Sequence, residues 1–294
     1  MSADGRTLLA SLREEQRVLA VDLDAGTSRG ILNTQALVDG ERRFLSWVEP
    51  ENLVRLGGDD RFLLLAAVSD NEEENRVAEI NASGDILRLV DAIPRTGVSD
   101  IVRDGQGRVY LSTEFEDKIF VLDETTLERV NEIAWPGAET NRVIVRPDRI
   151  FSLGLWWDGR VRVFDFTAKR ETGSADVGTR SWDLAYDDAT NRLYIPKMIA
   201  GNLLVVDAAT MVLEARRRVG FGARPIEIDA RRRRLLLGNM YDGRFTAYDL
   251  DTGDLVFETR LGGYLKGMIV DEKRGKAYTG CACGIFEIDL DVIG

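Results

Sequence analysis

The sequence predicts an all-β protein, a seven-bladed β-propeller made of four-stranded antiparallel blades. Two observations carry this prediction. In the central part of the chain an acidic or amide residue ends an apolar strand at every 42nd position, at Asn81, Asp123, Asp165, Asp207 and Asp249. The pattern extends back to Asp22 and forward to Asp289, which gives seven occurrences in 294 residues. A repeat of about 40 to 45 residues with four short strands is typical of propeller blades.

The four strands of one repeat are clearest between residues 220 and 261. Apolar and polar residues alternate over 225–228, 234–238, 244–249 and 255–260, with Gly, Asp and Arg residues between these stretches. The third stretch ends at Asp249, which begins the turn Asp-Leu-Asp-Thr-Gly. Asp accepts hydrogen bonds from the backbone of such a turn, and Gly supplies a positive φ. We therefore expect the periodic residue to cap the hairpin between the third and fourth strands of each blade.

The repeats predict one domain over 1–294. Their bounds are approximately 4–38, 51–93, 94–135, 136–177, 178–219, 220–261 and 262–294. We expect incomplete terminal blades, because 6–11 aligns with the second strand of the third repeat and the seventh repeat stops after its third strand, 285–289. Two explanations are open. The chain is a piece of a longer exported or membrane-anchored parent, periplasmic or extracellular, or it is a complete cytoplasmic protein with an unusual ring closure.

Composition favours a soluble globular protein, with 44% hydrophobic residues and no run that resembles a transmembrane segment. The net charge of -11 opposes attraction to phosphate backbones, so nucleic acid is not an expected partner.

The chain contains no histidine. Histidine is the most common acid or base near neutral pH and the commonest transition-metal ligand, so no Ser-His-Asp or Cys-His site can exist. We predict no catalytic residues and no cofactor. A Ca²⁺ site made of oxygen ligands stays open, with Asp70, Glu72 and Glu74 as candidate ligands in the loop between the second and third strands of the second repeat.

The two cysteines, Cys281 and Cys283, are too few for a structural zinc site without histidine. A disulfide across one intervening residue is expected to be strained, because extended neighbours at that spacing lie near the upper Cα limit. We expect reduced thiols in a turn. A redox pair or a metal shared with another chain is the alternative.

Two stretches resemble a known family of propeller repeats. Residues 201–210 and 243–253 are similar to the third strand and the Asp-x-x-Thr turn of the YVTN/YncE-like seven-bladed propellers, also called the lactonase-type propeller superfamily. The Gly-His and Trp-Asp signatures of WD40 repeats are absent, and Trp182-Asp183 lies at a different place in its repeat. Members of the family are often binding or scaffold domains, frequently exported in bacteria. The resemblance therefore implies a binding role and brings no catalytic motif.

Ligands of propellers usually bind at the loop face around the central axis. Early loops are acidic, with Glu14, Glu15, Asp70, Glu72 to Glu74, Glu114, Glu116 and Asp117, whereas later loops carry Trp156, Trp157, Met198, Met240 and Tyr241. Near the axis, the inner strands are predicted to begin at Asp100, Arg142, Asp183, Arg224 and Lys266. Such a ring can hold a small anionic or zwitterionic ligand, with Arg142 and Arg224 as bidentate donors. The alternatives are solvated acids, Trp side chains that fill the blade core, and charges that pair around the channel.

On the opposite face, Arg231 to Arg234 form a basic turn that we expect to be solvated, with an anionic membrane surface as the alternative. Taken together, the sequence predicts a non-catalytic propeller that recognises a protein or a small ligand through its loop face. One alternative is a metal-assisted hydrolase or lactonase-like enzyme with Asp100, Asp183 and Glu227 as ligands. Another is a structural module of a larger exported or membrane-anchored protein.

Overall fold

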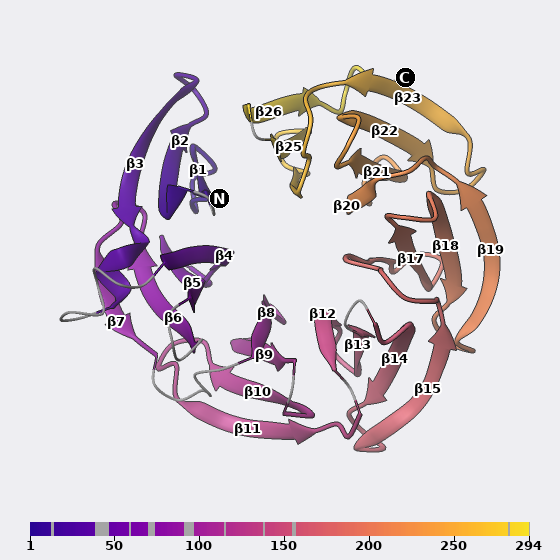
Figure 1. Cartoon of the computed structure of the whole chain (residues 1–294), viewed down its shortest axis with the longest axis horizontal. Helices are drawn as coiled ribbons and strands as arrows, with labels where there is room; N and C mark the ends of the chain where they lie inside the picture. The colour runs from indigo at the N-terminus through magenta and orange to yellow at the C-terminus, as the bar shows by residue number, and fades with distance from the viewer. Residues whose placement is uncertain are drawn as a thin grey trace. The chain divides into compact units, whose positions relative to one another are not determined.

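The computed structural model confirms the predicted fold class, a seven-bladed β-propeller whose blades are antiparallel sheets (Figure 1). It describes residues 1–12, 15–38, 47–58, 60–69, 74–90, 97–114, 116–137, 139–154, 157–281 and 283–293, without the side chains of 47–51, 69 and 74. Residue contacts divide the chain into two compact units, Met1–Pro147 and Asp148–Gly294.

The first three sheets follow one another along the chain. The first contains β1 (Thr7–Leu12), β2 (Arg17–Asp22) and β3 (Thr27–Asn33), and the 3-10 helix η2 (Thr34–Leu37) follows it. The second contains β4 (Trp47–Arg55), β5 (Arg61–Ser69), β6 (Glu74–Asn81) and β7 (Ile86–Leu89). The third contains β8 (Val98–Arg103), β9 (Arg108–Thr113), β10 (Lys118–Asp123) and β11 (Arg129–Ala134).

Four further sheets complete the fold. The fourth sheet contains β12 (Thr140–Val145), β13 (Arg149–Gly154), β14 (Arg160–Asp165) and β15 (Arg170–Asp176), and the fifth contains β16 (Ala185–Asp187), β17 (Arg192–Lys197), β18 (Asn202–Asp207) and β19 (Val212–Arg218). The sixth sheet contains β20 (Ala223–Asp229), β21 (Arg234–Asn239), β22 (Arg244–Asp249) and β23 (Leu255–Arg260). The seventh contains β24 (Gly267–Asp271), β25 (Lys276–Cys281) and β26 (Gly284–Asp289). The first and last sheets have three strands, which confirms the expectation of incomplete terminal blades.

In the third to sixth sheets the second strand is the most buried and the fourth strand is the most exposed. β21 is buried from its second residue onwards, whereas almost all of β19 is exposed. Leu236, Phe245 and Leu265 belong to one buried cluster between neighbouring blades of the second unit. Apolar side chains packed between blades supply most of the stability of such a fold, because they leave water when the blades stack.

The periodic residue caps the hairpin between the third and fourth strands, as predicted. In all seven repeats its side-chain oxygen accepts a backbone N–H two to four residues further on, at distances of 2.7 to 3.0 Å for Asp22, Asn81, Asp123, Asp165, Asp207, Asp249 and Asp289. Backbone hydrogen bonds lower the pKa of Asp123 and Asp249, because they favour the ionised carboxylate. The residue belongs to the scaffold.

A second periodic aspartate, which sequence reasoning missed, ends the first strand of three blades. Asp187, Asp229 and Asp271 are 42 residues apart and buried, and each accepts a backbone N–H from the turn that follows it. Their arginine partners include two residues of the basic turn. Arg232 pairs with Asp229 and Asp291, and Arg233 pairs with Asp187 and Asp251. The expectation of a solvated turn is therefore wrong for these two arginines, since buried carboxylates require a counter-charge.

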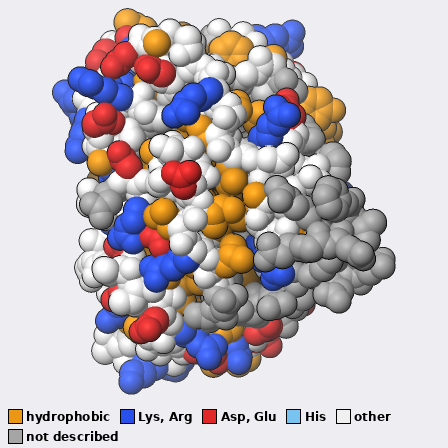
Figure 2. Space-filling model, turned by 90° about the vertical axis from the view of Figure 1, so that its left-hand side faces the viewer, with side chains coloured by type: hydrophobic (Ala, Val, Ile, Leu, Met, Phe, Trp, Pro, Cys, Tyr) orange, Lys and Arg blue, Asp and Glu red, His pale blue; other side chains and the backbone are white. Residues whose placement is uncertain are grey.

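The side of the molecule on which β3 and β7 lie in Figure 1 shows Lys, Arg, Asp and Glu side chains interspersed around a central hydrophobic area (Figure 2). The exposed large hydrophobic residues of β7 are Leu87 and Leu89. Among the described residues, no helix has the length and apolar character needed to cross a membrane.

Candidate functional site

Two of the predicted axial residues meet in the first unit. Asp100 in β8 is 2% exposed, and its carboxylate accepts hydrogen bonds from Arg142 Nη1 at 3.1 Å and from Asn52 Nδ2 at 2.5 Å. The backbone N–H groups of Ile101 and Val143 donate to it at 3.0 and 3.1 Å. Asn52 lies in β4 and Arg142 in β12, so one carboxylate joins three strands from successive blades.

The surroundings of Asp100 indicate a structural role, in which its carboxylate links neighbouring strands. Burial raises its pKa above the ordinary value of 3.8, while Arg142 and the backbone donors act in the opposite direction. Its lone pairs are largely used by protein donors, which leaves little capacity for a metal ion. Within the described part of the chain, no group of three or more His, Cys, Asp and Glu residues can hold a metal. Asp70, Glu72 and the side chain of Glu74 lie outside the described residues.

Replacing Arg142 by methionine should lower the free energy of unfolding by about 1–3 kcal/mol at pH 7, because a buried carboxylate loses its counter-charge and a charged donor. The loss should shrink as the pH falls toward 3.8 and Asp100 becomes protonated. Urea unfolding at both pH values checks this. Lys118→Met, which breaks the more exposed pair with Glu132, is the control and should cost under about 1 kcal/mol at either pH. A loss from Arg142→Met that does not depend on pH would contradict the assignment.

Exposed apolar side chains gather on loops of the second unit. Ile199, Phe221, Tyr241 and Tyr264 are 42%, 54%, 44% and 52% exposed. We call these four residues the aromatic face. The rings of Phe221 and Tyr241 are stacked, with centroids 4.8 Å apart and planes 15° apart. Of the two predicted tryptophans, Trp157 is 52% exposed in its loop, and Trp156 lies outside the described residues.

A chain of backbone hydrogen bonds joins the loops that carry the aromatic face. Gly222 N–H donates to Met198 O at 2.7 Å, Met240 N–H to Gly222 O at 2.8 Å, and Tyr264 N–H to Met240 O at 2.6 Å. Each of these residues adjoins or belongs to the face. The loops therefore form one connected surface, although they come from three blades.

Asn239 and Gly222 hold the stacked pair in place. Asn239 Nδ2 donates to Phe221 O at 2.5 Å, and its Oδ1 accepts the N–H groups of Tyr241 and Asp242. Gly222 has φ +98, and a Cβ at this position would lie 2.8 Å from the Tyr241 ring and 2.4 Å from Asn239 Oδ1. The stack therefore requires glycine beneath it.

The remaining predicted axial residues lie in the second unit. The Arg224 guanidinium lies 5.0 Å from the centre of the Trp182 ring, and its Nη1 contacts Met240 Sδ at 3.6 Å. It therefore lies at the border of the aromatic face. Asp183 Oδ1 accepts the N–H of Leu184, and Lys266 is exposed just before β24. The structure thus joins Asp100 to Arg142 and gives Arg224 an aromatic partner.

Lys197, at the end of β17, is a buried polar residue that sequence reasoning missed. Its Nζ donates to the carbonyl oxygens of Gly178 and Thr179, and to Ser181 Oγ at 2.9 Å. Burial lowers its pKa from 10.5 to about 8, with Asp176 acting in the opposite direction. Lys197 lies 42 residues before Asn239, so the two residues occupy the same position in successive blades. Each of them donates hydrogen bonds to the loop that precedes its blade. The sequence signal that could have identified Lys197 is the 42-residue spacing of two polar residues at strand ends.

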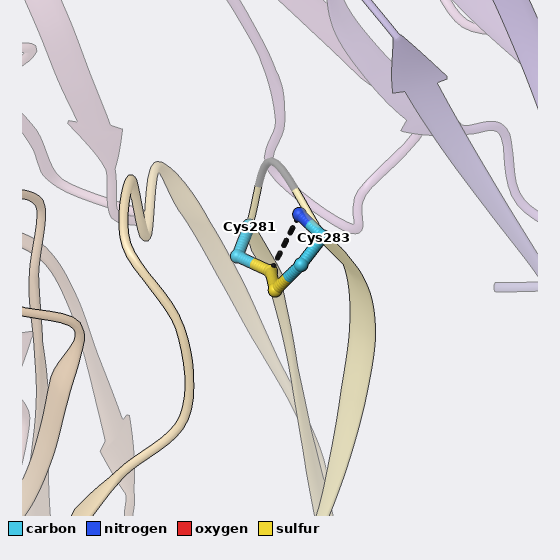
Figure 3. Close-up of a disulfide and its surroundings, with 2 residues drawn as sticks. All are labelled: Cys281 and Cys283. Carbon is cyan, nitrogen blue, oxygen red and sulfur yellow. Dashed lines mark hydrogen bonds between the residues drawn. A yellow bond between two sulfur atoms is a disulfide. The ribbon is translucent and has the colours of Figure 1, made fainter.

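The same position in the next blade is Cys281, which forms a disulfide with Cys283. The expectation of reduced thiols is wrong, because it assumed an extended chain. The turn between β25 and β26 brings the two Cα atoms to 5.2 Å, within the normal disulfide range (Figure 3).

A cleft of ≈ 390 Å³ is also present in the second unit, away from the predicted site residues. It is lined by Arg192, Glu214, Arg217 and Tyr248, among others. Arg192 and Glu214 form an ion pair at 2.6 Å within it. Part of the charge that lines the cleft is therefore neutralised by the ion pair between Arg192 and Glu214.

Comparisons with known proteins establish the fold alone. No protein-family profile matches the sequence, and no curated protein matches it either. A chain from the crystal structure of the mitotic checkpoint complex is similar, with a TM-score of 0.71 and 10% identity over 94% of this chain and 82% of that one. A chain of the Kuenenia stuttgartiensis hydrazine synthase has a TM-score of 0.76 and 15% identity over 100% and 95%. Both similarities agree with the β-propeller class defined by the sheets.

Proposed function

We propose that this protein is a non-catalytic interaction module that binds a protein partner through its aromatic face. The observation that carries the proposal is the stacked pair of Phe221 and Tyr241, two large rings that are about half exposed. Aromatic residues and arginine are enriched in the energetically important parts of protein interfaces. The aromatic face offers such rings, with Arg224 at its border.

The residues that hold the aromatic face favour binding because they order its loops in the unbound protein. Asn239, Gly222 and the chain of backbone hydrogen bonds fix the loops before a partner arrives. An ordered surface loses less conformational entropy on association than a flexible one, so more of the burial of apolar area appears as affinity. The resemblance to YVTN/YncE-like repeats supports the same role, since members of that family are often binding domains. The similar chain from the mitotic checkpoint complex comes from a protein assembly, which agrees with it.

The proposal predicts that Phe221→Ala combined with Tyr241→Ala weakens capture of partner proteins by at least about tenfold, because two interface anchors are lost. The measurement is cross-linking and quantitative mass spectrometry of proteins retained from native extract of the source cells by the immobilised full chain.

The matched control is Val212→Ala combined with Leu255→Ala, which removes two equally exposed apolar side chains from the outer strands β19 and β23. The control should retain the same proteins as the unmodified chain. Both double variants should remain folded, since all four side chains are about half exposed. Equal retention by a folded Phe221/Tyr241 variant would overturn the proposal.

A further inference from the structure

The disulfide between Cys281 and Cys283 lies in a place where it can react. It occupies the turn between β25 and β26, with Cys283 exposed and Cys281 half-buried (Figure 3). Reactive disulfides are those that a thiolate from solution can approach, whereas structural ones are usually buried.

The bond adds little to the hairpin that contains it. Cys281 already pairs with Gly284 across β25 and β26, and the sulfur bridge closes a loop of only three residues. A short loop excludes few conformations of the unfolded chain, so its stabilising effect is small. In the two preceding blades Lys197 and Asn239 tie the equivalent loop without sulfur. Stabilisation of the hairpin therefore does not account for the disulfide between Cys281 and Cys283.

The two sulfur atoms have different surroundings. The backbone N–H of Cys283 donates to Cys281 Sγ at 3.0 Å, so a negative charge that develops on Cys281 is stabilised within the same turn. The neighbouring loop carries Gly262, and a Cβ there would lie 2.5 Å from Cys283 Sγ. Cys283 Sγ therefore packs closely against Gly262, where a larger residue would clash with it.

From these observations we propose that Cys281 and Cys283 form a thiol–disulfide exchange site whose substrate is a dithiol that approaches Cys283 from solution. A substrate thiolate attacks Cys283 Sγ, a substrate–Cys283 disulfide forms, the Cys281–Cys283 bond breaks, and the electron pair leaves on Cys281. The second substrate thiolate then attacks the substrate sulfur and releases Cys283. The substrate is oxidised to a disulfide and the cysteine pair is reduced, with the two thiol protons of the substrate available to the new thiolates.

The first test mixes the oxidised full chain with an unstructured peptide that contains two reduced cysteines, followed by acid quenching and mass spectrometry. Each mole of protein should oxidise one mole of peptide while its circular dichroism spectrum stays native. Cys281→Ser and Cys283→Ser should each lose this activity by at least tenfold. A native protein that leaves the peptide reduced would overturn the proposal.

The second test assigns the attacked sulfur. With reduced glutathione as the probe of the oxidised full chain, acid quenching and peptide mapping should find glutathione on Cys283 in at least tenfold excess over Cys281. The Cys281→Ser and Cys283→Ser variants hold no disulfide between these positions and are the controls, which should form no adduct with reduced glutathione. Equal amounts on the two cysteines, or an adduct that forms only in denaturant, would overturn the site as proposed. Neither test involves the aromatic face, so the outcomes are independent of the proposed partner binding.

Discussion

Replacing Arg233 by methionine should lower the free energy of unfolding by about 3–5 kcal/mol, because it leaves a buried carboxylate without its counter-charge. Asp187 is 2% exposed and receives two hydrogen bonds from the Arg233 guanidinium, at 2.7 and 2.9 Å. The same guanidinium donates to Asp251 at 2.8 Å. Asp187 ends β16 and Arg233 precedes β21, so the pair connects two blades of the second unit.

The pH dependence of this effect follows from the carboxylate. Burial by itself raises the pKa of Asp187, but the hydrogen bonds from Arg233 and Thr190 outweigh it and the pKa is lowered. The stabilisation is therefore present above the ordinary value of 3.8 and is lost as the pH falls through the lowered pKa. Urea unfolding of both chains at pH 7 and near pH 3 measures it.

Arg192→Met is the matched control, because Arg192 pairs with Glu214 at 2.6 Å while both side chains are about one-third exposed or more. Its cost should stay under about 1 kcal/mol. Similar losses from the two variants would show that the burial of Asp187 has no energetic consequence.

Replacing Lys197 by methionine should remove a rise in stability at alkaline pH. The pKa of Lys197 is lowered from 10.5 to about 8, so the folded chain binds fewer protons than the unfolded chain between these values. The free energy of unfolding then increases with pH in this window, by about 1.4 kcal/mol per pH unit and about 3 kcal/mol in total. At pH 7 the variant should also lose about 1–3 kcal/mol, because two carbonyl groups lose their donor.

Lys273→Met is the control for this prediction, since Lys273 is exposed in a turn. Guanidinium unfolding at pH 7.5, 9 and 10.5 should show the alkaline rise in the parent and in the control, and its absence in Lys197→Met. A parent whose stability is flat over this range would contradict a lowered pKa for Lys197.

The sequence could predict what depends on local spacing. The 42-residue period, the hairpin role of Asp207 and Asp249, and the short terminal sheets depend on residues close in the chain, so pattern and turn chemistry suffice. The exposure of Tyr241 and Trp157 followed from the same register, since loops between strands lie at the surface.

The contacts between repeats could not be predicted in the same way. Arg233 reaches Asp187 across 46 residues, and which arginine of the basic turn would do so depends on side-chain direction in the folded turn. Phe221 lies between two glycines and gave no pattern, yet it stacks on Tyr241. The cysteine prediction failed because the Cα atoms of Cys281 and Cys283 are 5.2 Å apart, closer than in the assumed extended chain.

The end of the second strand in three successive blades carries Lys197, Asn239 and Cys281, so three different side chains share one place in the repeat. An amine, an amide and a sulfur atom all occupy one architectural position next to the preceding loop. The position thus tolerates changes of chemistry as long as the loop stays in place. A repeat protein presents the same position several times. One repeat can therefore carry a cysteine pair there, while Lys197 and Asn239 hold the loops of the neighbouring blades.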